Sequence, residues 1–187
     1  MDYQKVYHLE QYLFEDVANR YRLTHTISAF DFFCIVIWKA NRAKSKIAKK
    51  LLEKGFDTLE LAVETLCREI AEAENPKAQL KVLIKDWKFS LPMASAILTV
   101  LDEENFTVYD VRVCDQLGSF HSTRNRTFEK LWIEYQQYVS SVRQAAPAQL
   151  TLRDKDRWLW GKSFSEQLQR EVAAKFRNMR DTDHDYI

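Results

Sequence analysis

Apolar residues recur at intervals of three and four over most of the chain, which is the spacing of one face of an α-helix. The longest such stretch covers residues 29–54, where apolar positions step in this way from Phe33 to Leu51. The spacing predicts further helices over residues 8–22, 58–75, 76–86, 92–101, 108–117, 127–145, 151–164 and 165–180. We therefore expect an all-α fold, a compact bundle of about eight to ten helices with short connections.

Helix-ending and helix-starting residues stand where these predicted helices meet. Gly55 and Gly118 follow helical stretches, as C-cap glycines do. Pro76 and Pro92 stand at helix starts. Proline is favoured there because the N–H that it lacks would have no partner within the helix. Thr151 is expected to cap the first of the last two helices. We find no internal repeat or low-complexity linker, and we expect one helical domain over residues 1–187.

Glycine and proline are otherwise scarce, with three of each among 187 residues. Average usage of the two together is roughly 12%. Because these residues form turns and permit positive φ, their scarcity disfavours a sheet of many short strands. It also excludes Rossmann and P-loop nucleotide sites, which need several glycines beside a phosphate.

The overall charge is nearly balanced, with 28 basic and 27 acidic residues, and it indicates no class of partner. The local charge is uneven. Between Lys39 and Lys54 stand seven basic residues and one acidic residue, Glu53. Such a basic stripe on one helix is typical of phosphate binding, and an ordinary solvated helix face is the equal alternative.

Cysteine and histidine patterns predict neither disulfides nor a metal site. The three cysteines, Cys34, Cys67 and Cys114, have no CxxC spacing, and their odd number argues against a disulfide framework. The four histidines show no HxxxH or HExxH spacing, so we expect no catalytic metal. The first residues do not resemble a signal peptide, and the apolar stretch 32–38 is too short to span a bilayer. These features favour a cytoplasmic protein without membrane segments.

The segment with the most candidate functional residues covers residues 83–118. It combines a helix, a tight hairpin, a second helix that opens with Pro92, and an aspartate, Asp110, at the start of a short helix. Asp110 stands between Tyr109 and Val111 in apolar surroundings, where a carboxylate is costly unless it is hydrogen-bonded or used in catalysis. The structural alternative is that Asp110 caps the helix N-terminus, a common role of aspartate.

A slightly longer segment that includes it, residues 79–118, resembles the hairpin and catalytic-aspartate region of the helix-hairpin-helix DNA glycosylase superfamily. Leu91 stands at the position of the hairpin lysine, and Asp110 follows nineteen residues later, as the family aspartate does. Two further motifs of a divergent subgroup occur in order, WKxxR from Trp38 to Arg42 and LRDxDRxLW from Leu152 to Trp160. The chain departs from the superfamily at 88–90, where Lys-Phe-Ser stands in place of Gly-x-Gly.

The resemblance implies a monofunctional DNA glycosylase. Such an enzyme flips a modified or damaged base out of double-stranded DNA and hydrolyses its N-glycosidic bond, which leaves an abasic site. Asp110 would be the catalytic carboxylate, and because Leu91 replaces lysine no Schiff base would form. The activity would serve base-excision repair or defence against phage DNA with modified bases. We expect a monomer without a cofactor, although hairpins of this family can bind a monovalent cation through backbone carbonyls.

The other candidate residues each have a structural alternative. Those expected to contact DNA phosphates are Lys85, Lys88 and Ser90 at the hairpin and Lys39, Arg42 and Lys46 on the basic stripe. Those expected to line the base pocket are Trp38, Tyr109 and Arg112. The alternative for the lysines is an ordinary solvated position. The alternative for Trp38 and Tyr109 is packing in the core, and the alternative for Arg112 is a structural ion pair. Two rival functions stay open, a non-catalytic helix-hairpin-helix DNA-binding module and a helical protein-interaction domain.

Overall fold

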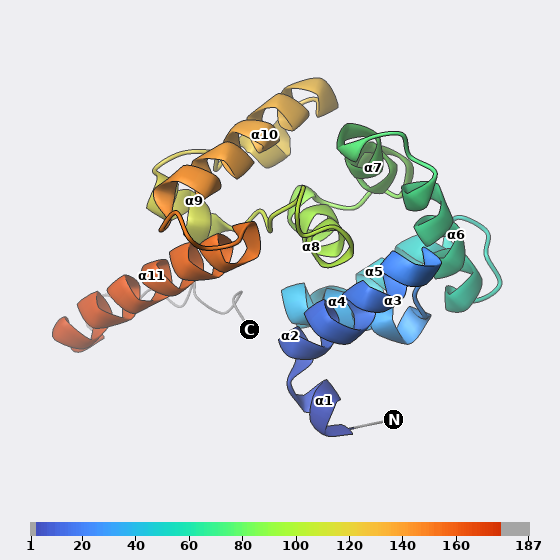
Figure 1. The fold of residues 1–187 in the computed structure, drawn as a ribbon, viewed down its shortest axis with the longest axis horizontal. Helices are drawn as coiled ribbons and strands as arrows, with labels where there is room; N and C mark the ends of the chain where they lie inside the picture. Colours follow the sequence, from blue (N-terminus) through green and yellow to red (C-terminus); the bar gives the residue numbers. More distant parts are fainter. Residues whose placement is uncertain (1–2, 177–187) are drawn as a thin grey trace. The chain divides into compact units, whose positions relative to one another are not determined.

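The computed structural model describes residues 3–176, and every regular element in this range is helical (Figure 1). The prediction of an all-α fold is confirmed, and contiguous helical segments taken together give about the predicted number of helices. The chain divides into two compact units, residues 1–106 and residues 107–187. A single domain over the whole chain stays a prediction. None of the helices among the described residues has the length and hydropathy that crossing a membrane requires.

The first unit is centred on a buried helix. The helical segments of this unit are α1 (Tyr3–Tyr7), α2 (Leu9–Gln11), the π-helical η1 (Tyr12–Val17), α3 (Ala18–Thr24), α4 (Ala29–Ala40), the 3₁₀ turn η2 (Asn41–Ala43), α5 (Lys44–Leu52), α6 (Leu59–Ala71), α7 (Pro76–Lys81), the π-helical η3 (Val82–Asp86) and α8 (Leu91–Leu101). Helix α8 is buried at nine of its eleven residues, as a helix that is apolar all round must be. It packs against α3, α4 and α7, so the hairpin that leads into it is fixed to the core.

Capping residues set several helix starts in this unit. The Thr58 side chain accepts a hydrogen bond from Leu61 N–H at 3.2 Å. Asn75 does the same for Ala78 N–H at 3.0 Å, and Pro76 occupies the first turn of α7. These side chains satisfy backbone donors that have no partner inside the helix.

The prediction of one continuous helix over residues 29–54 is wrong. Helix α4 ends at Ala40, whose φ of −162° and ψ of 87° leave the helical region, and α5 begins at Lys44. Both sides of the break keep their buried apolar residues, so the periodicity of three and four continues across it. The change of direction lets α5 pack against both α4 and α6. As a result, Lys39 and Lys46 lie on different helices rather than on one stripe.

The second unit contains α9 (Val111–Leu117), the 3₁₀ turn η4 (Thr123–Asn125), α10 (Phe128–Ala145) and α11 (Leu152–Ala173). Helix α11 packs against α9 and α10, and its second half extends beyond them (Figure 1). Gly118, with φ of 68°, ends α9 as predicted, and Thr151 caps α11 by accepting from Asp154 N–H at 3.1 Å.

Two predicted boundaries in the second unit are wrong. Helix α9 begins at Val111 rather than at residue 108, because the backbone before it is extended through Asp110. The two predicted helices over 151–164 and 165–180 form one continuous helix, α11, as far as Ala173, and residues 177–180 lie outside the described range. Gly161 is tolerated inside α11 with open space around it, although glycine weakens helices.

A buried carboxylate joins three helical segments of the first unit. Asp31, in the first turn of α4, is 1% exposed. Its Oδ1 accepts from the Tyr12 hydroxyl at 2.5 Å, and its Oδ2 accepts from Ser28 Oγ at 2.8 Å and forms an ion pair with Arg20. Burial acts to raise the pKa of Asp31, but the hydrogen bonds from Tyr12, Ser28 and Arg20 outweigh it and lower the pKa below 3.8.

We predict that Asp31→Asn lowers the free energy of unfolding by about 2–3 kcal/mol at pH 7, because it removes the charge that Arg20 and Tyr12 face. Since the folded pKa is lowered, the stabilisation is present above pH 3.8 and is lost as pH falls through the folded pKa. Urea denaturation from pH 7 to pH 2 should show the wild type and variant converging in acid. The exposed Asp57→Asn is the control, and a pH-independent gap would contradict the prediction.

Candidate functional site

The hairpin between η3 and α8 has a backbone conformation that usually favours glycine. Phe89 N–H donates to Leu83 O at 2.9 Å, which ends the helix with a bond that spans six residues. Lys88, with φ of 58°, occupies the left-handed region at the centre of this ending. The turn therefore forms without the glycines of the superfamily pattern, and a lysine takes the left-handed position.

Two aromatic side chains fix this turn to the core of the first unit. Trp87 is buried, its Nε1 donates to Glu69 Oε2 at 2.6 Å, and its ring stacks on Phe56 with centroids 5.8 Å apart. Phe89 is also buried and lies 6.3 Å from the Phe32 ring. This packing holds Lys88 in its left-handed conformation.

Two lysines at the C-terminal end of α5 reach the carbonyl groups of the same turn, Lys50 from within the helix and Lys54 from the turn just after it. Lys50 Nζ donates to the Lys88 carbonyl, and Lys54 Nζ lies 3.4 Å from the Asp86 carbonyl oxygen and 4.1 Å from the Trp87 ring centroid. A monovalent cation at the hairpin, which the resemblance implies, would need these carbonyl oxygens. Because ammonium groups already bind them, the residues of this turn do not fit an added cation.

The predicted phosphate contacts fall into two groups within the first unit. Lys85, Lys88 and Ser90 are exposed and lie on or beside the turn, so the structure brings these three together. Lys39, Arg42 and Lys46 are divided among the end of α4, the turn η2 and the start of α5. Of these, Arg42 and Lys46 are exposed and Lys39 is half-buried.

Trp38, predicted in the base pocket, is half-buried near the end of α4. Its ring meets the Phe14 ring edge-on, with centroids 5.7 Å apart and planes at 77°. This contact supports the structural alternative of a packing residue. The exposed part of the ring still leaves a surface on which a base could stack.

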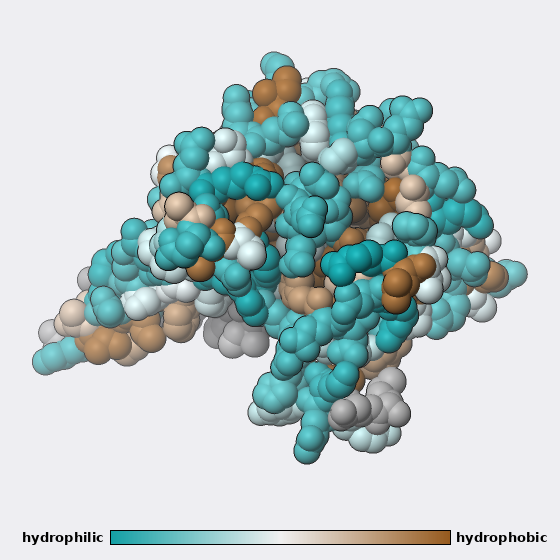
Figure 2. Space-filling view, viewed as in Figure 1, coloured by the Kyte–Doolittle hydropathy of each residue, from teal (hydrophilic) through white to brown (hydrophobic). Residues whose placement is uncertain are grey.

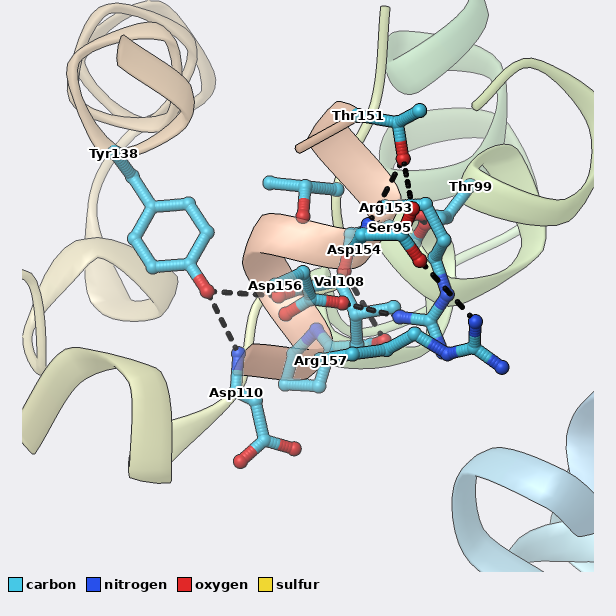
Figure 3. Close-up of polar contacts among 12 residues, drawn as sticks. Ser95, Thr99, Val108, Asp110, Tyr138, Thr151, Arg153, Asp154, Asp156 and Arg157 are labelled. Carbon is cyan, nitrogen blue, oxygen red and sulfur yellow. Dashed lines mark hydrogen bonds and ion pairs between the residues drawn. The ribbon is translucent and has the colours of Figure 1, made fainter. Parts of the chain in front are cut away.

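In the second unit, two buried tyrosines of α10 hold the extended segment 107–110. The Tyr135 hydroxyl donates to Thr107 O at 2.6 Å and accepts from Thr107 N–H at 3.2 Å. The Tyr138 hydroxyl donates to Val108 O at 2.7 Å and accepts from Asp110 N–H at 3.4 Å (Figure 3). Burial raises the pKa of both tyrosines, so the hydroxyls keep the protons that these bonds require.

Asp110 stands at the end of this segment and at the N-cap of α9. Its Oδ1 accepts from Arg112 N–H at 3.0 Å, which is the capping role that the sequence left open as the alternative. The residue is half-buried, and Figure 3 shows its carboxylate pointing away from Tyr138. The local fold therefore fixes both the backbone and one carboxylate oxygen of Asp110.

Arg112 is buried beside an exposed aromatic pair of α11. It is 8% exposed, its Nη1 donates to Gln167 Oε1 at 2.5 Å, and its guanidinium lies 5.4 Å from the Trp160 and 5.6 Å from the Phe164 ring centroid. The two rings stack with centroids 5.5 Å apart and an interplanar angle of 11°. Trp160 ends the LRDxDRxLW motif, and both residues of the pair are about 40% exposed.

The aromatic pair belongs to a longer apolar side of α11. Figure 2 shows apolar residues gathered along one side of the projecting helix. The exposed apolar residues of this helix and just beyond it are Trp158, Trp160, Phe164, Leu168, Val172 and Phe176. Most follow one another at intervals of four, and this spacing is the sequence signal that could have identified the surface.

Tyr109, the remaining base-pocket prediction, lies in the core of the second unit. Its ring is 5.4 Å from the Tyr138 ring, and its hydroxyl donates to Phe120 O at 2.5 Å. Burial raises its pKa to about 12. The structure therefore supports the core alternative for Tyr109 and not an exposed stacking role.

Comparisons of the chain with protein-family models, with curated proteins and with solved structures gave no match. Within residues 3–176, no three His, Cys, Asp or Glu side chains are grouped so that they could hold a metal ion. The three cysteines are buried free thiols, and burial raises the pKa of each to about 11. The functional interpretation therefore depends on the turn, on Asp110 and on the surfaces beside them.

We predict that Tyr138→Phe lowers the free energy of unfolding by about 1–3 kcal/mol, because it leaves the Val108 carbonyl and the Asp110 N–H without their buried partner. Urea denaturation measures this change. Tyr7→Phe is the matched control, since the same hydroxyl is lost from a residue that is 85% exposed. Equal stabilities of the two variants would show that the tyrosine does not hold the segment.

A second pair of variants separates the cap from the charge at Asp110. We predict that Asp110→Ala costs about 1 kcal/mol of stability through the lost cap, whereas Asp110→Asn stays within about 0.5 kcal/mol of the wild type, because asparagine caps as well as aspartate. Thermal and urea unfolding test both. An Asn variant as unstable as the Ala variant would contradict the capping geometry.

Proposed function

We propose that the chain is a monofunctional DNA glycosylase that flips a modified or damaged base from double-stranded DNA and hydrolyses its N-glycosidic bond. The observation that carries the proposal is Asp110, a half-buried carboxylate on a backbone held by Tyr138. It stands where the resemblance to helix-hairpin-helix glycosylases implies the catalytic aspartate. We propose further that the chain acts as a monomer in the cytoplasm, in base-excision repair or in defence against phage DNA with modified bases.

The turn of the first unit supplies groups suited to a DNA phosphate. Lys85, Lys88 and Ser90 are exposed there, and Ser90 is the N-cap of α8. In the described structure the Ser90 side chain makes no capping hydrogen bond, and Pro92 in the first turn has no N–H, so the first turn of α8 offers the N–H groups of Leu91 and Met93. A helix N-terminus and nearby lysines together favour an anion, and such contacts position the duplex without reading its sequence.

The aromatic pair beside Arg112 supports a role in holding the flipped base. Arg112 follows Asp110 by two residues, and its guanidinium is fixed against Trp160 and Phe164. An extruded base exposes two π-faces, and enzymes of this kind stack it on aromatic side chains. We therefore extend the proposed base pocket in the second unit from Arg112 to Trp160 and Phe164, and we omit Tyr109. Trp38 lies in the first unit and stays a separate prediction.

The proposed reaction uses the Asp110 carboxylate in two ways. As the bond between C1′ and the base nitrogen breaks, its electron pair leaves with the base and positive charge develops on the sugar, which the carboxylate stabilises. A water molecule forms the new C1′–O bond and transfers one proton to Asp110 as general base, from which the proton returns through solvent to the departing base. The products are the free base and an abasic site.

The test is a panel of duplexes that carry different modified or damaged bases, incubated with the full chain and then treated with alkali. We expect alkali-dependent strand breaks for at least one base, and a loss of about 10²-fold or more in rate for Asp110→Asn, which keeps the cap. Borohydride should trap no covalent adduct. An equally active Asn variant would exclude Asp110 as the catalytic residue, and efficient trapping would exclude a monofunctional mechanism.

One observation favours a second candidate, a non-catalytic DNA-binding module. Asp110 already has an ordinary structural role as the N-cap of α9. This alternative expects salt-sensitive binding to duplex DNA, no strand breaks with any base, and unchanged binding by Asp110→Asn. A helical protein-interaction domain, the third possibility, would show no salt-sensitive duplex binding.

A further inference from the structure

We propose that Lys50 and Lys54 are a built-in cation site of the turn 86–90, so that this turn binds a DNA phosphate without a bound monovalent ion. The inference rests on the proposed function for its phosphate and on contacts within the first unit for everything else. It assigns these two lysines a role distinct from that of the basic residues elsewhere on α5.

The contacts direct both ammonium groups at the turn. Lys50 lies in the last turn of α5, and Lys54 lies in the turn that follows, two residues after the helix ends at Leu52. Lys50 donates to the Lys88 carbonyl, and Lys54 to the Asp86 carbonyl at 3.4 Å. Burial of Lys50 and the charge of the nearby Lys46 lower the pKa of Lys50, as expected of an ammonium group drawn partly out of water.

The carbonyl groups at the start of the turn carry partial negative charge, which a nearby positive charge stabilises. The first residues of the turn end the continuous helical stretch from Pro76 to Asp86, and the carbonyls at such an end carry the negative part of the helix dipole. A phosphate bound at the N-terminus of α8 would therefore approach the carbonyl oxygens of this helix end. An ammonium group has three N–H donors, so it can satisfy carbonyls and neutralise this negative end at once.

The neighbouring lysine on α5 shows a different arrangement. Lys49 is 78% exposed and pairs with Glu53 at 3.7 Å, one turn further along the same helix. It carries the same charge on the same element, but no described contact joins it to the turn. Lys49 is therefore a matched control for the loss of one positive charge.

The first measurement needs no DNA. Thermal unfolding of the full chain is compared in KCl and in choline chloride at equal ionic strength, for the wild type, Lys50→Ala, Lys50→Arg and Lys49→Ala. We expect the wild type and Lys49→Ala to melt within about 1 °C in the two salts. Lys50→Ala should melt about 2–4 °C lower in choline chloride. At least half of that loss should return in KCl, where K⁺ can reach the vacated carbonyls, and Lys50→Arg should behave like the wild type.

The second measurement uses a 30-base-pair unmodified duplex and fluorescence anisotropy in the same salts. We expect wild-type affinity to differ by less than about twofold between the two cations, since counterion release depends on ionic strength more than on the identity of the ion. Lys50→Ala should bind about fivefold or more weakly in choline chloride, with most of the loss restored by K⁺. Lys49→Ala should lose little affinity and show no such difference between cations.

Two results would overturn the inference. One is a wild type that becomes more stable, or binds DNA more tightly, in K⁺ than in choline. The other is a Lys50→Ala variant whose stability does not respond to K⁺, whether or not it is destabilised, because the lysine would then be a tether and not a cation substitute. If no form of the chain binds duplex DNA, the proposed function fails, and the melting experiment still decides the role of Lys50.

Discussion

The hydrogen bonds from two tyrosine hydroxyls to the segment 107–110 are the constraint on which the second unit depends. An extended segment without a neighbouring strand has backbone groups that need partners when they are buried. Tyr135 and Tyr138, spaced by three on α10, supply a donor and an acceptor each. They fix the point at which α9 begins, and hence the position of Asp110 and of the Arg112 side chain that follows.

A comparable constraint operates in the turn of the first unit. There a missing glycine does not prevent a left-handed residue, because the helix ending and the burial of Trp87 and Phe89 fix the backbone around Lys88. The cost of a left-handed non-glycine residue is of order 1–2 kcal/mol, which packing of two large aromatic side chains can offset. The departure from Gly-x-Gly therefore changes the side chains that the turn presents, and the turn itself still forms.

Local signals predicted well where local forces decide, as at Thr58, Pro76 and Thr151. They failed where distant packing decides. The break at Ala40 leaves the apolar periodicity intact, so no spacing reveals it. Contacts between residues far apart in the sequence, such as Arg112 with Gln167, were also not predicted. Helical spacing shows which residues share a face of one helix, but not which faces of different helices meet. The basic stripe illustrates both failures, since it divides between helices and two of its lysines face a turn far along the chain.

The capping and catalytic interpretations of Asp110 are compatible. A catalytic carboxylate is effective when its position is fixed before the substrate arrives, because no reorganisation is then needed as charge develops. The hydrogen bond from Arg112 N–H holds Oδ1, and the bond from Asp110 N–H to Tyr138 holds the backbone behind it. The same contacts that a cap needs therefore orient the carboxylate away from the core. Stability measurements alone cannot separate the two roles, whereas replacing the charge and keeping the cap does.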